Sequence, residues 1–213
     1  MSDDTGPDQL RDARDQGDLA TRRKAEIMAA AGELIGEQGY DAVRLRDVGR
    51  AAGVSIGMIQ HYFGSRDELL QETLSSASRE RVRSWTDSGN RHSDPGRRLG
   101  ALLDQAVADD HRCLMWIQTC AAASRHPQLR PDVVLTQNAW REGLNAVITD
   151  GVAHQTWTPQ LTVAQIVDVL VPTIDGLMLE AATGSAAEKN GGRPHRSEVL
   201  RNVASSLLRV TSL

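Results

Sequence analysis

Apolar residues recur every three or four positions along most of the chain, the spacing of one face of an α-helix. Over residues 45–52, Leu45, Val48 and two alanines fall on one side and charged residues fall on the other. Gly53 follows at a position where a left-handed residue can end a helix without a Cβ penalty. The pattern therefore predicts a short helix over residues 45–52 that stops at Gly53.

A second short helix is predicted over residues 56–63. Ser55 stands at its N-cap position, where a hydroxyl can accept a hydrogen bond from an open backbone N–H two or three residues later. Ile59 and Phe63 lie four apart and are expected to face inward. Two helices joined by a tight, glycine-containing turn form the layout that places the second helix in the DNA major groove. Many helical hairpins share this spacing, so the spacing alone leaves the function open.

The periodicity extends on both sides of this motif. Aromatic residues make up only 3% of the chain and β-branched runs are scarce, which argues for an all-helical protein. With the two short helices, about nine helices are expected. The seven others are predicted over residues 21–38, 66–85, 97–109, 112–125, 131–150, 162–183 and 195–210, with a loop at 86–95.

Charge is distributed unevenly. Residues 1–19 carry six aspartates against two arginines and have little to bury, which predicts a disordered acidic tail. Residues 21–66 carry seven basic side chains against five acidic ones, although the chain as a whole has a formal charge of −4. Because exposed charges are screened beyond roughly 8 Å, a phosphate backbone would meet the local sign. Arg22, Arg23 and Lys24 fit either a DNA-backbone contact or a solvated charge run.

No apolar run approaches the ~20 residues that cross a bilayer, and the N-terminus is acidic, unlike a signal peptide. A soluble, cytoplasmic protein without membrane contact is expected. The spacing of His111, Cys113, Cys120 and His126 does not suit a metal site, and no motif of an enzyme is present. Neither a metal nor a cofactor is expected. The two cysteines are interpreted as buried small residues, with a thiol sensor as the alternative.

The run GYDAVRLRDVGRAAGVSIGMIQHYFGSRDELL, from Gly39 to Leu70, resembles the DNA-binding segment of the tetracycline-repressor (TetR) family of transcriptional regulators. An aromatic after glycine, then RDV, AAGVS, G, YF and S-basic-acidic-E-LL, stand in the expected order and spacing. After the acidic tail at residues 1–19, the resemblance implies a three-helix helix-turn-helix DNA-binding domain at 20–66 and a helical effector-binding and dimerisation domain at 67–213. Residues 162–183 and 195–210 would form the dimer interface of a homodimer.

The resemblance also implies contacts with a double-stranded DNA operator. Gln60 suits adenine and Arg46 suits guanine, although Arg46 beside Asp47 also fits a solvated pair. Arg44 replaces the usual Thr or Ser of the family, so it can reach phosphate but caps the helix less well. Gly57 allows close approach of the backbone. The full set of expected DNA-contacting residues is Arg44, Arg46, Ser55, Ile56, Gly57, Met58, Gln60, His61, Tyr62 and Arg66.

Within this set, Ile56 and Met58 stand where relatives often carry Lys or Arg and Thr, so they are expected to contact thymine methyl groups. His61 is interpreted as a neutral groove or backbone contact. Tyr62 and Arg66 match phosphate-contacting positions of the family. The operator sequence stays open.

A small-molecule effector is implied among the middle helices of the second domain. Its candidate contacts are apolar with few polar partners, as pockets generally are, and they fit core packing equally well. They are Met115, Trp116, Thr119, Cys120, Trp140, Leu144, Ile174 and Met178. Residues 112–131 and 171–184 also resemble the choline-responsive branch of the family. A cationic ligand would need an aromatic cage, to which Trp116 and Trp140 can contribute, but no carboxylate is clearly placed beside them.

Three hypotheses from different classes remain. A homodimeric repressor, released from a palindromic operator by an effector, accounts for both predicted domains. An effector-independent DNA-binding activator or architectural protein accounts for the first domain alone. The third hypothesis is a helical enzyme or carrier with a vestigial DNA-binding segment. It does not explain why the motif residues Gly53, Ser55, Gly57 and Tyr62 are intact. The sequence favours the first hypothesis.

Overall fold

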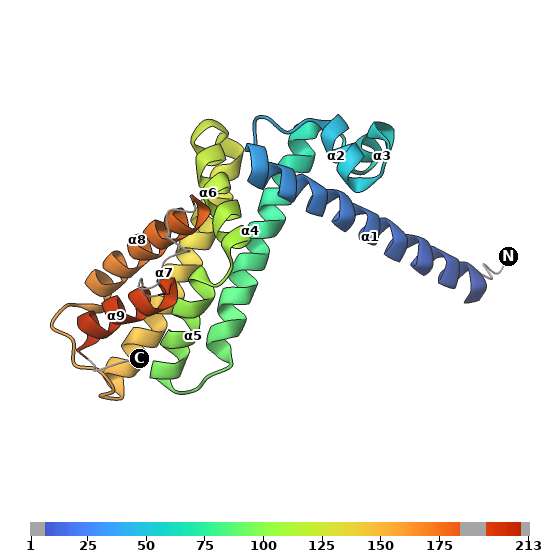
Figure 1. Cartoon of the computed structure of the whole chain (residues 1–213). Helices are drawn as coiled ribbons and strands as arrows, with labels where there is room; N and C mark the ends of the chain where they lie inside the picture. The colour runs from blue at the N-terminus through green and yellow to red at the C-terminus, as the bar shows by residue number, and fades with distance from the viewer. Residues whose placement is uncertain (1–6, 184–194, 210–213) are drawn as a thin grey trace. The chain divides into compact units, whose positions relative to one another are not determined.

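The computed structural model describes residues 7–183 and 195–209, with side chains from residue 17 onward. This part of the chain is helical and contains no strand, which confirms the predicted all-α class. Figure 1 shows its elements in chain order. They are α1 (Pro7–Gln38), α2 (Leu45–Ala52), α3 (Ile56–Phe63), α4 (Arg66–Asn90), α5 (Pro95–Val107), α6 (Asp110–Arg125), the 3-10 turn η1 (Pro127–Leu129), α7 (Arg130–Ala153), α8 (Val163–Ala182) and α9 (Arg196–Leu208).

The chain divides into two compact units, Met1–Thr73 and Leu74–Leu213. The division falls inside α4, whereas the sequence placed it after Arg66. One continuous helix therefore contributes its first turns to the N-terminal unit and the remainder to the C-terminal unit.

Helix α1 starts at Pro7, much earlier than the predicted start at Thr21. The Thr21 hydroxyl donates to the Gly17 carbonyl oxygen at 2.9 Å, so this residue lies inside the helix and does not cap it. The prediction of a disordered tail was wrong from Pro7 to Leu19, and residues 1–6 lie outside the described part. Proline suits a first helical turn, and extending an existing helix costs far less than starting one.

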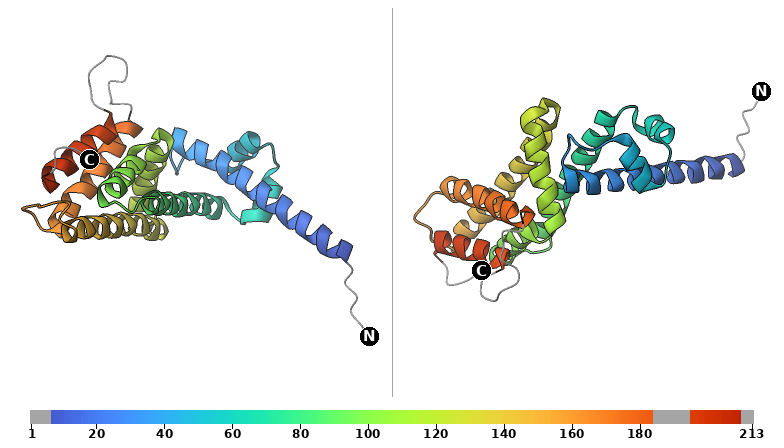
Figure 2. Two further views of the ribbon diagram at one scale, coloured as in Figure 1. Left: turned by 90° about the horizontal axis from the view of Figure 1, so that it is seen from below. Right: turned by 45° about the horizontal axis from the view of Figure 1, so that its top comes forward.

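The core of the N-terminal unit forms where α1 packs against α2, and α2 against α3 (Figure 2). Ile27, Ile35, Val48 and Ile59 are completely buried there. The stripe predicted for the first helix thus faces the core, and the two short helices lie against it. Tyr40, in the turn after α1, is 2% exposed.

Helix α4 begins at the predicted position. The Ser65 hydroxyl accepts from the Glu68 N–H at 3.2 Å and donates to the Glu68 carboxylate at 2.7 Å. The helix continues to Asn90, past the predicted end near Trp85, because its last turn packs against α5. A Cβ on Gly89 would stand 2.9 Å from Leu102 Cδ2, and the Ser88 hydroxyl donates to the Ala101 carbonyl oxygen at 3.1 Å.

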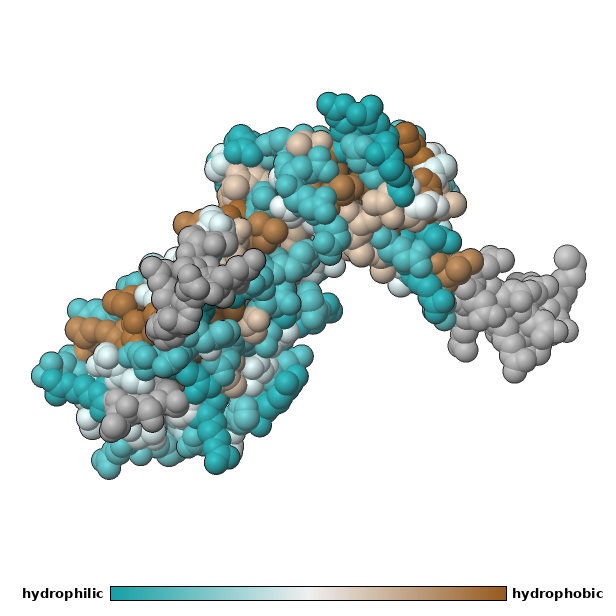
Figure 3. All heavy atoms as spheres, in the orientation of Figure 1, coloured by the Kyte–Doolittle hydropathy of each residue, from teal (hydrophilic) through white to brown (hydrophobic). Residues whose placement is uncertain are grey.

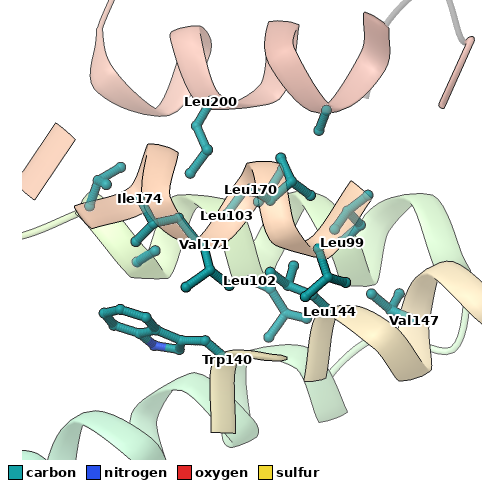
Figure 4. Packing of buried hydrophobic residues seen from close by; sticks show 14 of the residues in the cluster. Leu99, Leu102, Leu103, Trp140, Leu144, Val147, Leu170, Val171, Ile174 and Leu200 are labelled. Atoms are coloured by element: carbon teal, nitrogen blue, oxygen red, sulfur yellow. The ribbon is translucent and has the colours of Figure 1, made fainter. Parts of the chain in front are cut away.

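The C-terminal unit surrounds one apolar core. Helix α6 packs against α8, α5 against α7, and α9 against both α5 and α8. Figure 4 shows Leu99, Leu103, Leu144, Leu170 and Ile174 meeting at its centre, and all five are completely buried. The five helices predicted after residue 95 are all present, with ends that differ by a few residues.

Candidate DNA-contacting surface and ligand-binding core

The turn between α2 and α3 has the predicted geometry. Gly53 adopts φ 66°, in the left-handed region, and its N–H donates to the Gly49 carbonyl oxygen. The Ser55 hydroxyl accepts a hydrogen bond from the Met58 N–H at 3.1 Å and so caps α3. Arg44 occupies the N-cap position of α2 without a side-chain hydrogen bond to the helix, and its side chain stays exposed.

Gly49 is a requirement of this turn that the sequence did not reveal. A Cβ on Gly49 would lie 2.8 Å from the carbonyl oxygen of Val54, which is backbone and cannot swing away. Helix α2 can therefore approach the residues that lead into α3 only with glycine at this position. No local pattern marks it, because the close contact depends on how the turn folds back.

Helix α3 has one buried and one exposed side. Ile59 and Phe63 are 0% and 6% exposed and hold the helix on the core. Ile56 and Met58 are 45% and 40% exposed. Apolar surface is visible over α3 in Figure 3. Gly57, Gln60 and His61 are also exposed, and Tyr62 is half-buried with its ring edge-on to His61. The structure thus brings five of the residues predicted to contact DNA onto the accessible side of one short helix, namely Ile56, Gly57, Met58, Gln60 and His61.

Arg46 is available for a contact outside the protein. Its guanidinium lies 3.7 Å from the Asp47 carboxylate, and its side chain is 62% exposed. Arg50 lies 3.8 Å from the same carboxylate and is 79% exposed. Exposed ion pairs of this kind contribute only about 0–1 kcal/mol, so pairing with Asp47 does not prevent either arginine from contacting another molecule.

Arg66 has acceptors within its own unit. Its Nε–H donates to the Val43 carbonyl oxygen at 2.7 Å, and its Nη2 donates to the Tyr40 carbonyl oxygen. The guanidinium also pairs with Asp67 at 2.6 Å and lies over the Tyr40 ring, 5.4 Å from its centroid. Arg66 therefore fastens the turn that precedes α2 to the start of α4, a role that the sequence did not show.

Six of the eight residues predicted around an effector belong to the apolar core of the C-terminal unit or pack against it, namely Trp116, Cys120, Trp140, Leu144, Ile174 and Met178. The other two, Met115 and Thr119, lie on α6. All eight are buried except Cys120, which is half-buried. The Trp116 and Trp140 rings meet edge-to-face with centroids 5.1 Å apart, and Trp85 lies 6.2 Å beyond Trp140. None of the eight lines the three cavities that lie beside Arg97 and Trp157, among α4, α5 and α7, and on α9.

Asp175 supplies the carboxylate that the sequence did not place. The Trp116 Nε1–H donates to Asp175 Oδ1 at 2.8 Å across a separation of 59 residues. Burial raises the pKa of Asp175, and the hydrogen bond from Trp116 opposes that rise. Two aromatic rings and a carboxylate are the elements of a site for an organic cation.

A cation of the protein already lies at this cluster. The guanidinium of Arg81, which is 8% exposed, stands over the Trp116 ring, 5.8 Å from its centroid. Arg81 also donates to the Arg112 carbonyl oxygen at the start of α6. Burial, reinforced by the charge of Arg112, lowers the pKa of Arg81 to about 10, so it remains charged at neutral pH. We call Arg81, Trp116, Trp140 and Asp175 the tryptophan cluster.

The cysteines have the properties of core residues. Both are free, and Cys113 is buried. Burial raises the pKa of Cys113, and burial with the nearby Asp175 raises that of Cys120 to about 12. Thiols reach the reactive thiolate form only near their pKa, which makes both poor nucleophiles at neutral pH.

Two negative findings apply to the segments that the structure describes. Nowhere in them do three or more His, Cys, Asp or Glu side chains gather as a metal site would require. Each of their helices is too short or too polar to serve as a transmembrane segment.

A capped helix with an exposed face, held by a preceding helix and a glycine turn, defines the helix-turn-helix class of DNA-binding regulators. Residues 27–73 match the family described as "Bacterial regulatory proteins, tetR family", and residues 95–206 match "BetI-type transcriptional repressor, C-terminal". The chain belongs to the TetR family of transcriptional regulators and is a DNA-binding regulator, not an enzyme.

One curated relative agrees with this assignment, and two solved structures share the fold. The HTH-type transcriptional regulator BetI of Agrobacterium fabrum is 30% identical over 169 residues, which cover 78% of this chain and 79% of that protein. A transcriptional regulator from Saccharomonospora viridis, solved in complex with choline, superimposes with a TM-score of 0.75 at 19% identity over 90% of this chain and 98% of that one. A TetR regulator from Haloarcula marismortui has a TM-score of 0.74 at 21% identity, over 91% of this chain and 100% of that one.

Proposed function

We propose that the protein is a homodimeric repressor that binds a palindromic operator through α3 and leaves it when a small molecule binds the C-terminal unit. The observation that carries the proposal is the exposed face of α3, with Gln60 flanked by Ile56 and Met58 on a helix fixed by the Ser55 cap. An amide side chain can bond both major-groove groups of adenine, and the apolar neighbours suit thymine methyl groups. The remaining predicted contacts, Arg44, Arg46, Gly57, His61 and Tyr62, surround this centre.

For Arg66 we propose a positioning role. Its guanidinium is bonded to two backbone carbonyls and a carboxylate, so it sets the path of the chain into α2. Any phosphate that Arg66 contacts would use only the N–H groups left over from these bonds.

The proposed dimer interface is the outer face of α8 and α9. Val169 and Leu179 of α8 are 41% and 49% exposed, and apolar surface gathers over α8 in Figure 3. A groove of about 470 Å³ on α9 is lined by Val199, Val203 and Leu207 with two polar neighbours. Apolar patches of this kind on a soluble protein mark interaction sites, and a second copy with the same face can cover them symmetrically.

The dimer can be tested by analytical ultracentrifugation. Val169→Asp places a charge in the proposed interface at a valine that is 41% exposed on α8, and we expect a monomer with much weaker operator binding. Val134→Asp changes another exposed valine, 53% accessible on α7, and serves as the matched control. A Val169→Asp protein that sediments like the control would contradict the proposed interface.

For the effector we propose a small organic cation at the tryptophan cluster. The match to the BetI-type C-terminal family and the choline complex of a protein with this fold support the proposal. So does Asp175, whose carboxylate lies beside Trp116. An incoming cation would compete with Arg81 for the face of Trp116. Because Arg81 belongs to α4, which begins in the DNA-binding unit, its displacement acts on a helix shared by both units.

Calorimetry with choline and its uncharged carbon analogue 3,3-dimethylbutan-1-ol tests the effector class. We expect choline to bind more tightly, and Asp175→Asn to remove most of the difference. Asp168→Asn is the control, since Asp168 lies on the same helix but pairs with Arg141 at 2.6 Å. Equal affinity for the two compounds in the unmodified protein would reject the cationic effector and leave DNA binding untouched.

DNA binding is tested with the DNA immediately upstream of the protein's own coding sequence, at two salt concentrations and with a random duplex as control. We expect a preference for the upstream DNA and an affinity that falls steeply with salt, because phosphate contacts release counterions. Retention of this preference with no release by any small molecule would favour the effector-independent activator or architectural protein.

A further inference from the structure

The C-terminal unit has a second candidate ligand site, formed by α4, α5 and α7. It is a cavity of about 480 Å³, within the roughly 300–1,000 Å³ range of small-molecule pockets. One wall is apolar and includes Trp85 and Leu102, while Arg98 and Glu142 supply opposite charges. The tryptophan cluster does not line it, so this site lies outside the proposed effector site.

The first reason to assign a ligand is a pair of unsatisfied donors. The Trp85 Nε1–H and the Arg98 Nε–H are both buried and have no hydrogen-bond partner among the described residues. Trp85 itself is only 2% exposed. A buried donor without a partner costs about 1–3 kcal/mol, and such groups in native proteins call for an explanation.

The second reason is the pair of charges. Within the described segments neither Arg98, which is half-buried, nor Glu142, which is exposed at the mouth of the cavity, forms an ion pair or a side-chain hydrogen bond. Other arginines of the unit are matched with acidic partners. A ligand with one negative and one positive group could bond both side chains at once. A singly charged ligand would bond one of them and leave the other unmatched.

The cavity is also maintained by glycine. A Cβ on Gly143 would stand 2.7 Å from Trp85 Nε1, so glycine at this position allows the indole edge to lie directly against α7. A Cβ on Gly89 would likewise stand 2.9 Å from Leu102 Cδ2. Three helices therefore approach closely around the cavity, while Trp85 presents an aromatic wall to it.

We propose that this cavity binds a small zwitterion with an apolar body, of the size and chemistry of an apolar α-amino acid. Arg98 and the Trp85 Nε1–H donate to the carboxylate, Glu142 accepts from the ammonium group, and Leu102 contacts the apolar part. Trp85 also touches Trp140, so a ligand here adjoins the tryptophan cluster without entering it. The proposal goes beyond the repressor function and does not depend on it.

The test uses three compounds with the same apolar body: L-phenylalanine, phenethylamine and 3-phenylpropionate. Calorimetry on the full-length protein is expected to show that phenylalanine binds at least about tenfold more tightly than either singly charged analogue, since each charge-assisted hydrogen bond contributes roughly that factor. Equal binding of the three compounds, or no binding of any, would overturn the proposal.

Two charge-removing variants assign the roles. Arg98→Gln is expected to abolish the preference for phenylalanine over phenethylamine, and Glu142→Gln the preference over 3-phenylpropionate. Arg97→Gln removes the same charge from the neighbouring position of α5, which is exposed and lines a different cavity, and should retain the affinities of the unmodified protein. If Arg97→Gln and Arg98→Gln behave alike, the assignment of Arg98 is wrong.

Failure of this proposal can be told apart from failure of the repressor function. Binding of the upstream DNA is measured on the same preparation without any ligand. Intact DNA binding with no selectivity among the three compounds removes only the zwitterion site. Selective phenylalanine binding without DNA binding would support the site and contradict the proposed function.

Discussion

Three glycines of the helix-turn-helix motif differ in what a methyl group would meet, and Ala substitution at each should change the stability of the N-terminal unit in a different way. Gly53 has φ 66° and no atom within 4 Å of a built Cβ. Gly49 has an ordinary helical backbone, but its Cβ would lie 2.8 Å from the Val54 carbonyl oxygen. At Gly57 the nearest atom is the Ser55 Oγ, 3.9 Å away.

The magnitudes follow from these contacts. At Gly53, the left-handed conformation costs an alanine roughly 1–2 kcal/mol, and the less flexible unfolded chain returns about 0.4–1 kcal/mol. The free energy of unfolding should therefore fall by about 1 kcal/mol. At Gly49, overpacking costs roughly 1–3 kcal/mol against a helix-propensity gain of about 1 kcal/mol, again a net loss. At Gly57 a methyl group meets no close contact, so only the helix-propensity gain of alanine over glycine, about 0.5–1 kcal/mol, remains.

Hydrogen exchange measured on peptides from α2 and α3 reports this local stability in the full-length protein. We expect Gly57→Ala to exchange more slowly than the unmodified protein, and Gly53→Ala and Gly49→Ala to exchange faster. Gly57→Ala should nevertheless bind DNA less tightly, because its methyl group stands on the face proposed to enter the groove. Faster exchange in Gly57→Ala, or unchanged exchange in Gly53→Ala, would refute the reasoning.

Two further predictions concern single side chains. Arg66→Ala should lower the thermal midpoint of unfolding, because it leaves the Val43 and Tyr40 carbonyl oxygens without their donor. Arg44→Ala removes an exposed side chain and should leave the midpoint unchanged. Equal midpoints for the two variants would mean that the hydrogen bonds of Arg66 do not stabilise the protein. Cys120, whose pKa of about 12 exceeds the reference 9.0, should react slowly with a thiol reagent in the native protein up to pH 9 and rapidly in urea. Because the native state holds the Cys120 thiol proton more tightly than the unfolded state does, the contribution of Cys120 to stability is present below pH 9 and is lost as the pH rises towards 12. Fast labelling of Cys120 in the native protein at pH 8 would contradict its burial.

Local pattern was sufficient for most of the helices and for the turn at Gly53. The left-handed residue, the Ser55 cap and the inward pair Ile59 and Phe63 each depend on neighbours within one or two helical turns, and all three were predicted. The start of α1 was missed because a polar, acidic segment was taken as disordered, although residues 8–20 contain a single glycine and no further proline.

Contacts between distant residues could not be predicted in the same way. Arg66 bonds carbonyls 23 and 26 residues earlier in the chain, and Asp175 bonds an indole 59 residues earlier. Nothing in the spacing of either residue indicates these partners. The cavity beside Trp85 likewise depends on three helices that meet only in the folded unit. Its charged residues, Arg98 and Glu142, were therefore absent from the residues expected to bind a ligand.

The central claim is that the exposed face of α3 reads DNA sequence, and fluorescence anisotropy of the unmodified protein and Gln60→Ala on operator and random duplexes tests it most directly. We predict that Gln60→Ala loses about 1–3 kcal/mol of binding to the operator, tolerates substitution at one base pair, and binds the random duplex as before. If the substitution weakens binding to both duplexes equally, or to neither, α3 does not read the operator through Gln60.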